Sequence, residues 1–189
     1  MKVVGIVCSP RRGGNTEILV REALDTIQGL GGETELITVA GKTIRPCDGC
    51  TTCDDAGECK IDDDMQEIYR KLTQADGMIL GSPVYFANVT AQAKIVIDRT
   101  RALSRGRKLR RKVAAAVIVA RRVGAGAVLG FLFTYFTSQR MIVAGGAIGY
   151  GDKKGDVREG VGGTANTSAL EEARNLGRAV VSLHRQLSA

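Results

Sequence analysis

The stretch KVVGIVCSPRRGGNT, residues 2–16, decides the fold. It opens with Lys2–Cys8, a short apolar run rich in β-branched residues, which is typical of a buried strand. The loop SPRRGGN follows, and from Thr16 to about Gly29 apolar residues recur at helical spacing. A strand, a glycine-rich loop and a helix in this order indicate the first unit of an α/β protein.

The same alternation of strand and helix continues along the chain. We expect four more strands, at Glu33–Val39, Gly77–Gly81, Val113–Ala120 and Met141–Ile148. Four more helices are expected, at Asp63–Ala75, Thr90 to about Arg101, Ala125–Thr137 and Ser168 to about Leu187, the last with a capping box of Ser168 and Glu171. The sequence therefore predicts an α/β fold, in which one domain spanning residues 1–189 has a doubly wound five-stranded parallel sheet with helices on both faces.

Length and composition fit a globular protein. A chain of 189 residues, 44% apolar and 25% charged, can bury a core of ordinary size. The longest apolar stretches, Val113–Ala120 and Val123–Phe136, are separated by two arginines, and each is too short to span a membrane. The first apolar run is too short for a signal peptide, so we expect a cytoplasmic protein.

The net charge of +7 is unevenly distributed. Eleven Lys or Arg and no acid lie between Arg99 and Gly151, whereas residues 48–64 carry seven carboxylates against the single lysine Lys60. The basic cluster RGRKLRRK, residues 105–112, could contact nucleic acid through phosphates. No aromatic residue is interleaved to stack on bases, so a solvated helix end and loop are favoured.

The loop at residues 9–16, SPRRGGNT, suits a phosphate monoester. Ser9 and Thr16 carry hydroxyls, Gly13 and Gly14 allow backbone N–H groups to turn inward, and the N-terminus of the next helix attracts an anion. Arg11 can add a charge-assisted contact. The dinucleotide pattern GxGxxG and the triphosphate pattern GxxxxGK(S/T) are both absent, which disfavours those ligands. The alternative is a glycine-rich turn with a structural role only.

A second loop follows the third strand. Gly81, Ser82 and Pro83 end that strand sharply and place Tyr85 and Phe86 at the same sheet edge as the phosphate loop. Aromatic rings and backbone amides there could flank a flavin and hydrogen-bond its polar rim. The alternative is a pair of core aromatics under a loop.

Four of the five cysteines lie within thirteen residues, spaced C-x2-C-x2-C-x5-C: Cys47, Cys50, Cys53 and Cys59. One loop with this spacing can wrap four thiolates around a compact centre, and a 4Fe-4S cluster is the first choice. Structural zinc, disulfides and free thiols are the alternatives. This cysteine-rich insertion, at about residues 45–61, follows the second strand. It should therefore emerge at the sheet edge of the other two loops, where two redox centres could exchange electrons directly. The alternative is that the cluster faces the flavin of another subunit.

The motifs SPRRGGNT at residues 9–16 and GSPVYF at residues 81–86 resemble those of the NADPH-dependent FMN reductase and iron–sulfur flavoprotein group of the flavodoxin-like superfamily. The resemblance runs over nearly the whole chain, and the compact cysteine motif is similar to the one that marks iron–sulfur flavoproteins. It implies a flavodoxin-like fold, bound FMN and a homodimer or homotetramer. It also implies that Ser9, Arg11, Gly14, Asn15 and Thr16 bind the FMN phosphate and that the isoalloxazine is lined by Pro83, Val84, Tyr85, Phe86 and Asn88.

These features favour an electron-transfer flavoprotein. We expect ferredoxin to reduce the cluster, the cluster to reduce FMN, and FMN to reduce a small-molecule acceptor. The first alternative is an NAD(P)H-dependent FMN or quinone reductase with structural cysteines. A second is a non-catalytic zinc-bearing module that binds nucleic acid through Arg99–Lys112, which no motif supports.

Several further residues carry expectations. Arg121 and Arg122 follow the fourth strand and could contact the flavin or an acidic donor. The very apolar helix at Ala125–Thr137 is expected to be buried against a partner subunit or within its own domain. The stretch Gly145–Gly163, with eight glycines, is expected to form a loop over the flavin edge. Two further expectations are that Cys8 is a core residue and that His184 is a surface residue.

Overall fold

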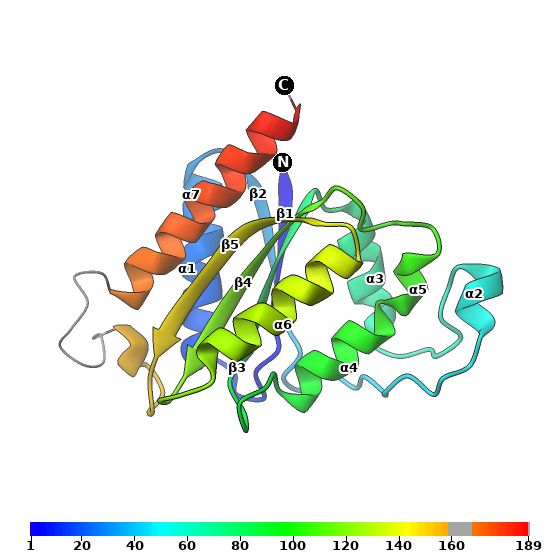
Figure 1. Ribbon diagram of the computed structural model, residues 1–189, viewed down its shortest axis with the longest axis horizontal. Coiled ribbons are helices and arrows are strands. Elements are labelled where there is room, and N and C mark those ends of the chain that lie inside the picture. Colours follow the sequence, from blue (N-terminus) through cyan, green and yellow to red (C-terminus); the bar gives the residue numbers. More distant parts are fainter. Residues whose placement is uncertain (159–167, 189) are drawn as a thin grey trace.

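The computed structural model describes residues 1–158 and 168–188. Within these residues the elements follow the order β1 (Lys2–Val7), α1 (Asn15–Gly29), β2 (Glu33–Thr38), α2 (Thr52–Ala56), α3 (Met65–Gln74), β3 (Gly77–Pro83), α4 (Ala91–Arg99), α5 (Arg101–Ser104), β4 (Val113–Ala120), α6 (Ala125–Ser138), β5 (Ile142–Tyr150), the 3-10 turn η1 (Asp156–Arg158) and α7 (Ala169–Ser188) (Figure 1).

The strands form one parallel sheet in the order β2-β1-β3-β4-β5. β1 is hydrogen-bonded to β2 on one side and to β3 on the other, so the direction of winding reverses between β1 and β3. This is the strand order of flavodoxin-like sheets, and ligands of such sheets bind outside the carboxyl ends of the strands at the reversal. The predicted fold class is confirmed.

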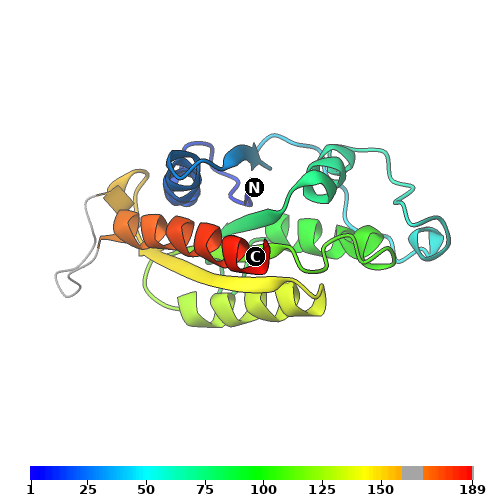
Figure 2. The ribbon, with the colours of Figure 1, turned by 90° about the horizontal axis from the view of Figure 1, so that it is seen from above.

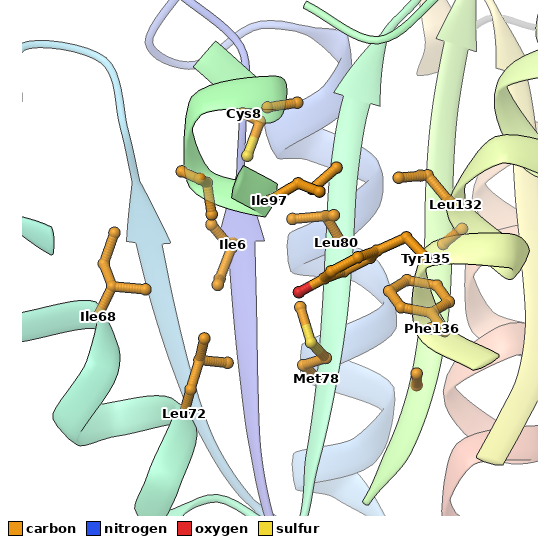
Figure 3. Close-up of a cluster of buried hydrophobic side chains, with 14 of the residues drawn as sticks. Ile6, Cys8, Ile68, Leu72, Met78, Leu80, Ile97, Leu132, Tyr135 and Phe136 are labelled. Carbon is orange, nitrogen blue, oxygen red and sulfur yellow. The ribbon is translucent and has the colours of Figure 1, made fainter. Parts of the chain in front are cut away.

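Helices cover both faces of the sheet, with α1 and α7 on one face and α3, α4 and α6 on the other (Figures 1 and 2). Two apolar cores result, because alternate side chains of a strand point to opposite faces. In β1, Val4 and Ile6 belong to the core under α3, α4 and α6, whereas Val3 and Val7 belong to the core under α1 and α7. Figure 3 shows side chains of the first core, among them Ile68, Leu72, Met78, Leu80, Ile97, Leu132, Tyr135 and Phe136.

Glycines let α1 approach the sheet closely. A Cβ atom on Gly5 of β1 would lie 2.7 Å from Leu24 Cδ1, and one on Gly81 of β3 would lie 2.6 Å from Val20 Cγ2 and 3.0 Å from Thr16 Cγ2. The contacts at 2.6 and 2.7 Å are shorter than two carbon atoms allow, so a Cβ at either position would displace the facing side chains of α1. The first turn of α1 therefore lies directly on the carboxyl ends of β1 and β3.

The element bounds agree with the sequence-based expectations to within a few residues. The observed β4 coincides with the expected strand, and β3 continues to Pro83 because Ser82 and Pro83 still pair with β4. One half of the predicted capping box of α7 is confirmed, since the Glu171 N–H donates to Ser168 Oγ at 3.2 Å. The Glu171 carboxylate instead pairs with two arginines of α7. The short helices α2 and α5 were not predicted.

The apolar helix α6 has one buried face and one open face. Val128, Leu132 and Phe136 are fully buried against the sheet, whereas Gly126 and Ala127 are exposed. Burial within its own domain thus accounts for only part of its apolar surface. No helix among residues 1–158 and 168–188 is both long and apolar enough to cross a membrane.

A buried ion pair anchors the cysteine-rich segment to α4. Arg99 Nη1 lies 2.7 Å from Asp63 Oδ2, and the two side chains are 1% and 3% exposed. The same guanidinium donates to Arg45 O at 2.8 Å and to Ile61 O at 3.3 Å, and the Asp63 carboxylate accepts the Arg45 N–H at 2.9 Å. One guanidinium therefore holds both ends of residues 45–63.

Further polar groups support this pair. The Tyr69 hydroxyl donates to Arg99 O at 2.8 Å and accepts from Arg99 Nε at 3.2 Å. Burial alone would raise the pKa of Asp63, but hydrogen bonds from Arg99, Arg45 and Met65 outweigh it and lower that pKa. Arg99 is thus a buried structural residue. The sequence-based grouping of Arg99 with the basic loop was wrong, because its guanidinium is enclosed by acceptors.

Replacing Asp63 by Asn should destabilise the fold, because Arg99 would remain buried without its counter-charge. We expect Asp63→Asn to lower the free energy of unfolding by about 3 kcal/mol at pH 7, measured by urea denaturation. The lowered pKa of Asp63 means that its stabilisation is present above the unfolded pKa, about 3.9, and is lost as the pH falls through the folded pKa. The difference in the free energy of unfolding between wild type and variant should therefore become smaller in acid.

The exposed neighbour Asp62 provides the control. Asp62→Asn should change the free energy of unfolding by less than about 0.5 kcal/mol. Equal losses for the two variants would show that the Arg99 ion pair does not anchor this segment.

Candidate functional site

A cavity of about 310 Å³ lies at the carboxyl ends of the strands, within the size range of small-molecule sites. It is lined by three loops and the first turn of α1, through Ser9, Arg11, Gly14, Asn15, Thr16, Pro83, Val84, Tyr85, Val119, Arg121, Gly151, Asp152, Lys153 and Lys154. Eight of the ten residues expected to hold FMN are in this set. Phe86 and Asn88, the other two, are not.

The two arginines of the phosphate loop have different surroundings. Arg11 lines the cavity, whereas Arg12 Nη2 donates to Ala40 O at 2.8 Å and ties the loop to the segment after β2. Ser9 is buried, and its Oγ accepts the Arg11 N–H at 3.1 Å. Arg11 is therefore the arginine of this loop that is available to an anion in the cavity.

The two glycines also differ. Gly13 has a φ of 62°, and its N–H donates to Glu17 Oε2 at 2.7 Å rather than into the cavity. Gly14 lines the cavity, and a Cβ there would lie 3.2 Å from Arg11 O. Gly13 thus turns the chain into α1, while Gly14 leaves the N-terminus of α1 open beside the hydroxyl-bearing residue Thr16. A helix N-terminus with such neighbours favours an anion.

The loop after β3 ends in a tight turn between Tyr85 and Asn88, whose backbones exchange hydrogen bonds of 2.9 and 3.0 Å. Phe86 and Ala87 have φ values of 47° and 59°, a left-handed conformation that costs a non-glycine residue about 1–2 kcal/mol. The Phe86 side chain is fully exposed. Strained backbone that carries an exposed aromatic residue is typical of a functional site. The alternative that Phe86 is a core residue is wrong.

Buried hydrogen bonds join this loop to the base of the phosphate loop. Thr90 Oγ1 donates to Cys8 O at 2.6 Å and accepts from the Ala93 N–H at 3.1 Å, which caps α4. Ser82 Oγ accepts the Thr90 N–H at 3.2 Å. Burial raises the pKa of the Cys8 thiol to about 12, which agrees with the expected core role. The two loops are thereby fixed relative to each other.

A third loop, residues 151–156, completes the cavity, and Asn15 holds it there. Asn15 Nδ2 donates to Lys153 O at 2.8 Å and to Asp156 Oδ1 at 2.7 Å, and Asn15 Oδ1 accepts the Gly155 N–H at 2.7 Å. The amide of Asn15 is therefore engaged by this loop. The sequence predicted a loop in this region but not its residues. The expected stretch begins inside β5, and residues 159–163 lie outside the described chain.

The cavity is cationic. Arg11, Arg121, Lys153 and Lys154 line it together with one acid, Asp152, which pairs with Arg121 at 3.0 Å. Arg121 was expected at this edge from the sequence, but Arg122, although exposed, does not line the cavity. This charge favours an anionic ligand.

The four clustered cysteines have different environments. Cys47 is exposed, Cys50 and Cys59 are partly exposed, and Cys53 is buried. Over residues 1–158 and 168–188, no three His, Cys, Asp or Glu side chains are grouped so as to hold a metal ion. The four thiols are thus not gathered around one point in this structure.

One ion pair joins the two ends of the cysteine-rich segment to each other, and another fastens its middle to α5. Lys60 Nζ lies 3.0 Å from Asp48 Oδ2, and Asp48 Oδ1 accepts the Cys50 N–H at 3.1 Å. These donors, the Cys50 N–H first, lower the pKa of Asp48. In the middle of the segment, Arg101 pairs with Asp54 at 2.5 Å. A second cavity, of about 410 Å³, lies between this segment, α3 and α5, and Cys59 is part of its wall.

Residues 1–154 match the sequence model of the family described as NADPH-dependent FMN reductase. The chain belongs to this family. It is 45% identical to an iron–sulfur flavoprotein of Methanocaldococcus jannaschii over 193 residues, which cover 97% of each chain. It is 37% identical to an iron–sulfur flavoprotein of Archaeoglobus fulgidus over 158 residues, covering 83% of this chain and 72% of the other.

Solved structures agree on the fold. RosB with a bound formylated riboflavin-5′-phosphate intermediate superposes with a TM-score of 0.77 at 18% identity, covering 100% of this chain and 80% of the other. A WrbA-like flavodoxin of Agrobacterium tumefaciens gives a TM-score of 0.66 at 17% identity, covering 98% and 97%. These likenesses establish a flavodoxin-like fold. Together with the family, they make the protein a flavin-dependent oxidoreductase.

Removing the Asn15 amide should release the third loop. We expect Asn15→Ala to accelerate amide hydrogen exchange in residues 151–156 by about tenfold or more, because three hydrogen bonds to that loop are lost. Exchange in β1 and β4 should not change. Hydrogen–deuterium exchange with mass spectrometry measures both, with exposed Asn175→Ala of α7 as the control. Unchanged exchange in the loop would show that Asn15 does not hold it.

Proposed function

We propose that the protein is an electron-transfer flavoprotein that passes electrons from ferredoxin, through a 4Fe-4S cluster and FMN, to a small-molecule acceptor. The observation that carries the proposal is the cationic cavity of about 310 Å³, which collects eight of the ten residues expected to hold FMN. The relatives described as iron–sulfur flavoproteins support the presence of the cluster as a second redox centre. When bound, the flavin supplies one- and two-electron chemistry and the cluster supplies one-electron chemistry.

Two ends of the cavity suit the two ends of FMN. At the α1 end, Ser9, Thr16, the helix N-terminus and Arg11 suit the phosphate. At the β3 end, Val84 and Tyr85 provide an apolar wall for the ring, with the exposed Phe86 beside it. The loop of residues 151–156 lines the cavity as well, through Gly151, Asp152, Lys153 and Lys154.

The cysteine-rich segment fits an iron–sulfur centre by its donors. Cys47, Cys50, Cys53 and Cys59 supply four thiolates, which is the full ligand set of such a cluster. Arg99 holds the two ends of the segment, and its middle is held by the exposed Arg101–Asp54 ion pair and the Lys108–Gly57 contact. Gathering the four thiols would require these surface contacts to rearrange but none of the pairing between strands. Ordering a loop as its thiolates take up metal is common in proteins.

An NAD(P)H-dependent FMN or quinone reductase with structural cysteines is the second candidate. The description of the matching family favours it, and so does the positive charge at the cavity, which exceeds what one FMN phosphate requires. Stopped-flow mixing separates the two. Rapid flavin reduction by NADPH in protein without iron would support the reductase, whereas reduction by ferredoxin only in iron-loaded protein would support the electron-transfer protein.

We also propose a homodimer or homotetramer. The open face of α6 adjoins the edge strand β5, and its partly buried Leu129, Phe131 and Phe133 offer apolar surface to a second copy of the chain. Light scattering on the purified protein gives the subunit number, and a monomer at micromolar concentration would contradict this proposal.

Metal content tests the cysteine assignment. Protein purified without oxygen should contain flavin and about four irons and four sulfides per chain. Cys50→Ser should lose iron and sulfide but keep the flavin, because the cavity does not include Cys50. Cys8→Ala is the matched control, since Cys8 is a buried core thiol and its loss should leave the iron content unchanged. Zinc in place of iron, or flavin without metal, would contradict the cluster.

Riboflavin, which lacks the phosphate, tests the phosphate site. Arg11→Ala should weaken FMN binding roughly tenfold or more, as expected for loss of a charged hydrogen bond, and leave riboflavin binding unchanged. Arg122→Ala removes the same charge outside the cavity and should have less than a twofold effect. Flavin fluorescence quenching gives all the dissociation constants. Equal effects on FMN and riboflavin would place Arg11 away from the phosphate.

A further inference from the structure

The loop that follows α5 and the end of α6 carry six cations, which together are called the basic surface: Arg105, Arg107, Lys108, Arg110, Arg111 and Arg140. Lys108, Arg110 and Arg111 line one cavity, whose wall also includes Asp76. All six cations except Lys108 are exposed, and none forms an ion pair with an acid of residues 1–158 or 168–188. The two parts of the surface are joined by backbone, since the Arg111 N–H donates to Arg140 O at 2.9 Å. By contrast, the nearby Arg101 is paired with Asp54.

The backbone of this surface is strained at three of its arginines. Arg107, Arg111 and Arg140 have φ values of 49°, 64° and 60°, in the region that favours glycine or asparagine. Glycine would relieve the strain at each position. At Arg107 and Arg140 this conformation ends a helix, since the next N–H groups, those of Lys108 and Met141, donate to Leu103 O of α5 and Phe136 O of α6. The backbone of these residues thus has a structural role, while their exposed charges remain available to a partner.

The basic surface adjoins the cysteine-rich segment. Lys108 lines the cavity that contains Cys59 and also the cavity lined by Arg110 and Arg111. Lys108 Nζ lies 3.5 Å from Gly57 O of the same segment. Figure 1 shows α5 beside α2, away from the sheet. A molecule bound to this surface therefore lies next to the cysteines.

The flavin cavity is at the opposite end of the sheet. β4 begins one residue after Lys112 and ends one residue before Arg121, which lines the cavity. Its eight residues span about 25 Å at the usual rise of a strand. The cysteine-rich segment, rather than the flavin, is thus the redox-active part that a molecule on the basic surface would reach first.

We propose that the basic surface docks an acidic protein that carries single electrons and delivers them to the cysteine-rich segment. This inference rests on the proposed function, because it assigns the entry side for electrons. Complementary charge over such a surface steers association and makes its rate depend on salt. Residues 99–112 include no aromatic side chain on which bases could stack, so a protein partner fits better than single-stranded nucleic acid.

Charge reversal tests the docking surface. The double variant R105E/R110E changes two exposed arginines, neither of which has a left-handed backbone. The control K94E/R178E makes the same change of charge on exposed residues of α4 and α7 that do not line this cavity. The holoprotein is mixed with a reduced acidic ferredoxin in a stopped-flow instrument at several salt concentrations, and with dithionite, which needs no docking surface. Binding of oxidised ferredoxin is measured by calorimetry.

The second-order rate constant with ferredoxin should fall about tenfold or more in R105E/R110E at low salt and less than twofold in the control. It should also fall steeply with salt in wild type, while reduction by dithionite is equal in all three proteins. Equal rate constants for the two variants would overturn the docking site. So would loss of binding to a single-stranded DNA 20-mer in R105E/R110E with ferredoxin binding intact.

The proposed function can fail separately. If ferredoxin does not reduce wild-type holoprotein although dithionite does, electron entry from ferredoxin is wrong. The calorimetric measurement of ferredoxin binding then tests the docking site independently of electron transfer. Salt-dependent ferredoxin binding that is lost in R105E/R110E supports the site, and absence of binding overturns it.

Discussion

Parallel pairing of β1 with both β2 and β3 is the constraint on which the rest of the site depends. Because every strand runs in the same direction, the loops at residues 9–16, 83–88 and 151–156 emerge at one edge although they are far apart in sequence. Glycine at positions 5 and 81 adds to this by letting α1 lie directly on the strand ends. The phosphate loop therefore owes its position to sheet packing as much as to its own residues.

The cysteine-rich segment obeys a different constraint. Its two ends are attached to α4 through one buried guanidinium, that of Arg99, which binds two carbonyls and a carboxylate there. A buried charge with incomplete partners is costly, so these contacts form together or not at all. The sheet and the flavin cavity use none of them. The flavin cavity is thus built from other contacts than those that hold the cysteine-rich segment.

Periodic patterns account for what the sequence could predict. Apolar runs define four of the five strands, and alternation of polar and apolar residues defines β2. The loop residues 9–16 and 83–85 were assigned to one edge because the carboxyl ends of parallel strands lie at one edge of the sheet. Contacts between distant residues were not predictable. Neither the engagement of Asn15 with residues 153–156 nor the burial of Arg99 has a local signal, and the left-handed turn at Phe86 lacks the glycine that would mark it.

The charged residues are also distributed differently around the cysteine-rich segment and around the flavin cavity. Acids are concentrated on the cysteine-rich segment at residues 48–64, where Asp48 and Asp54 pair with Lys60 and Arg101. The unpaired cations lie just beyond it, on the basic surface, while a second group of cations surrounds the flavin cavity about one strand length away. Two separate positive regions favour two separate anionic ligands, a protein at one end and a phosphate at the other. The cysteine-rich segment adjoins the first of these regions through Lys108, so under the proposed function it is the side on which electrons enter.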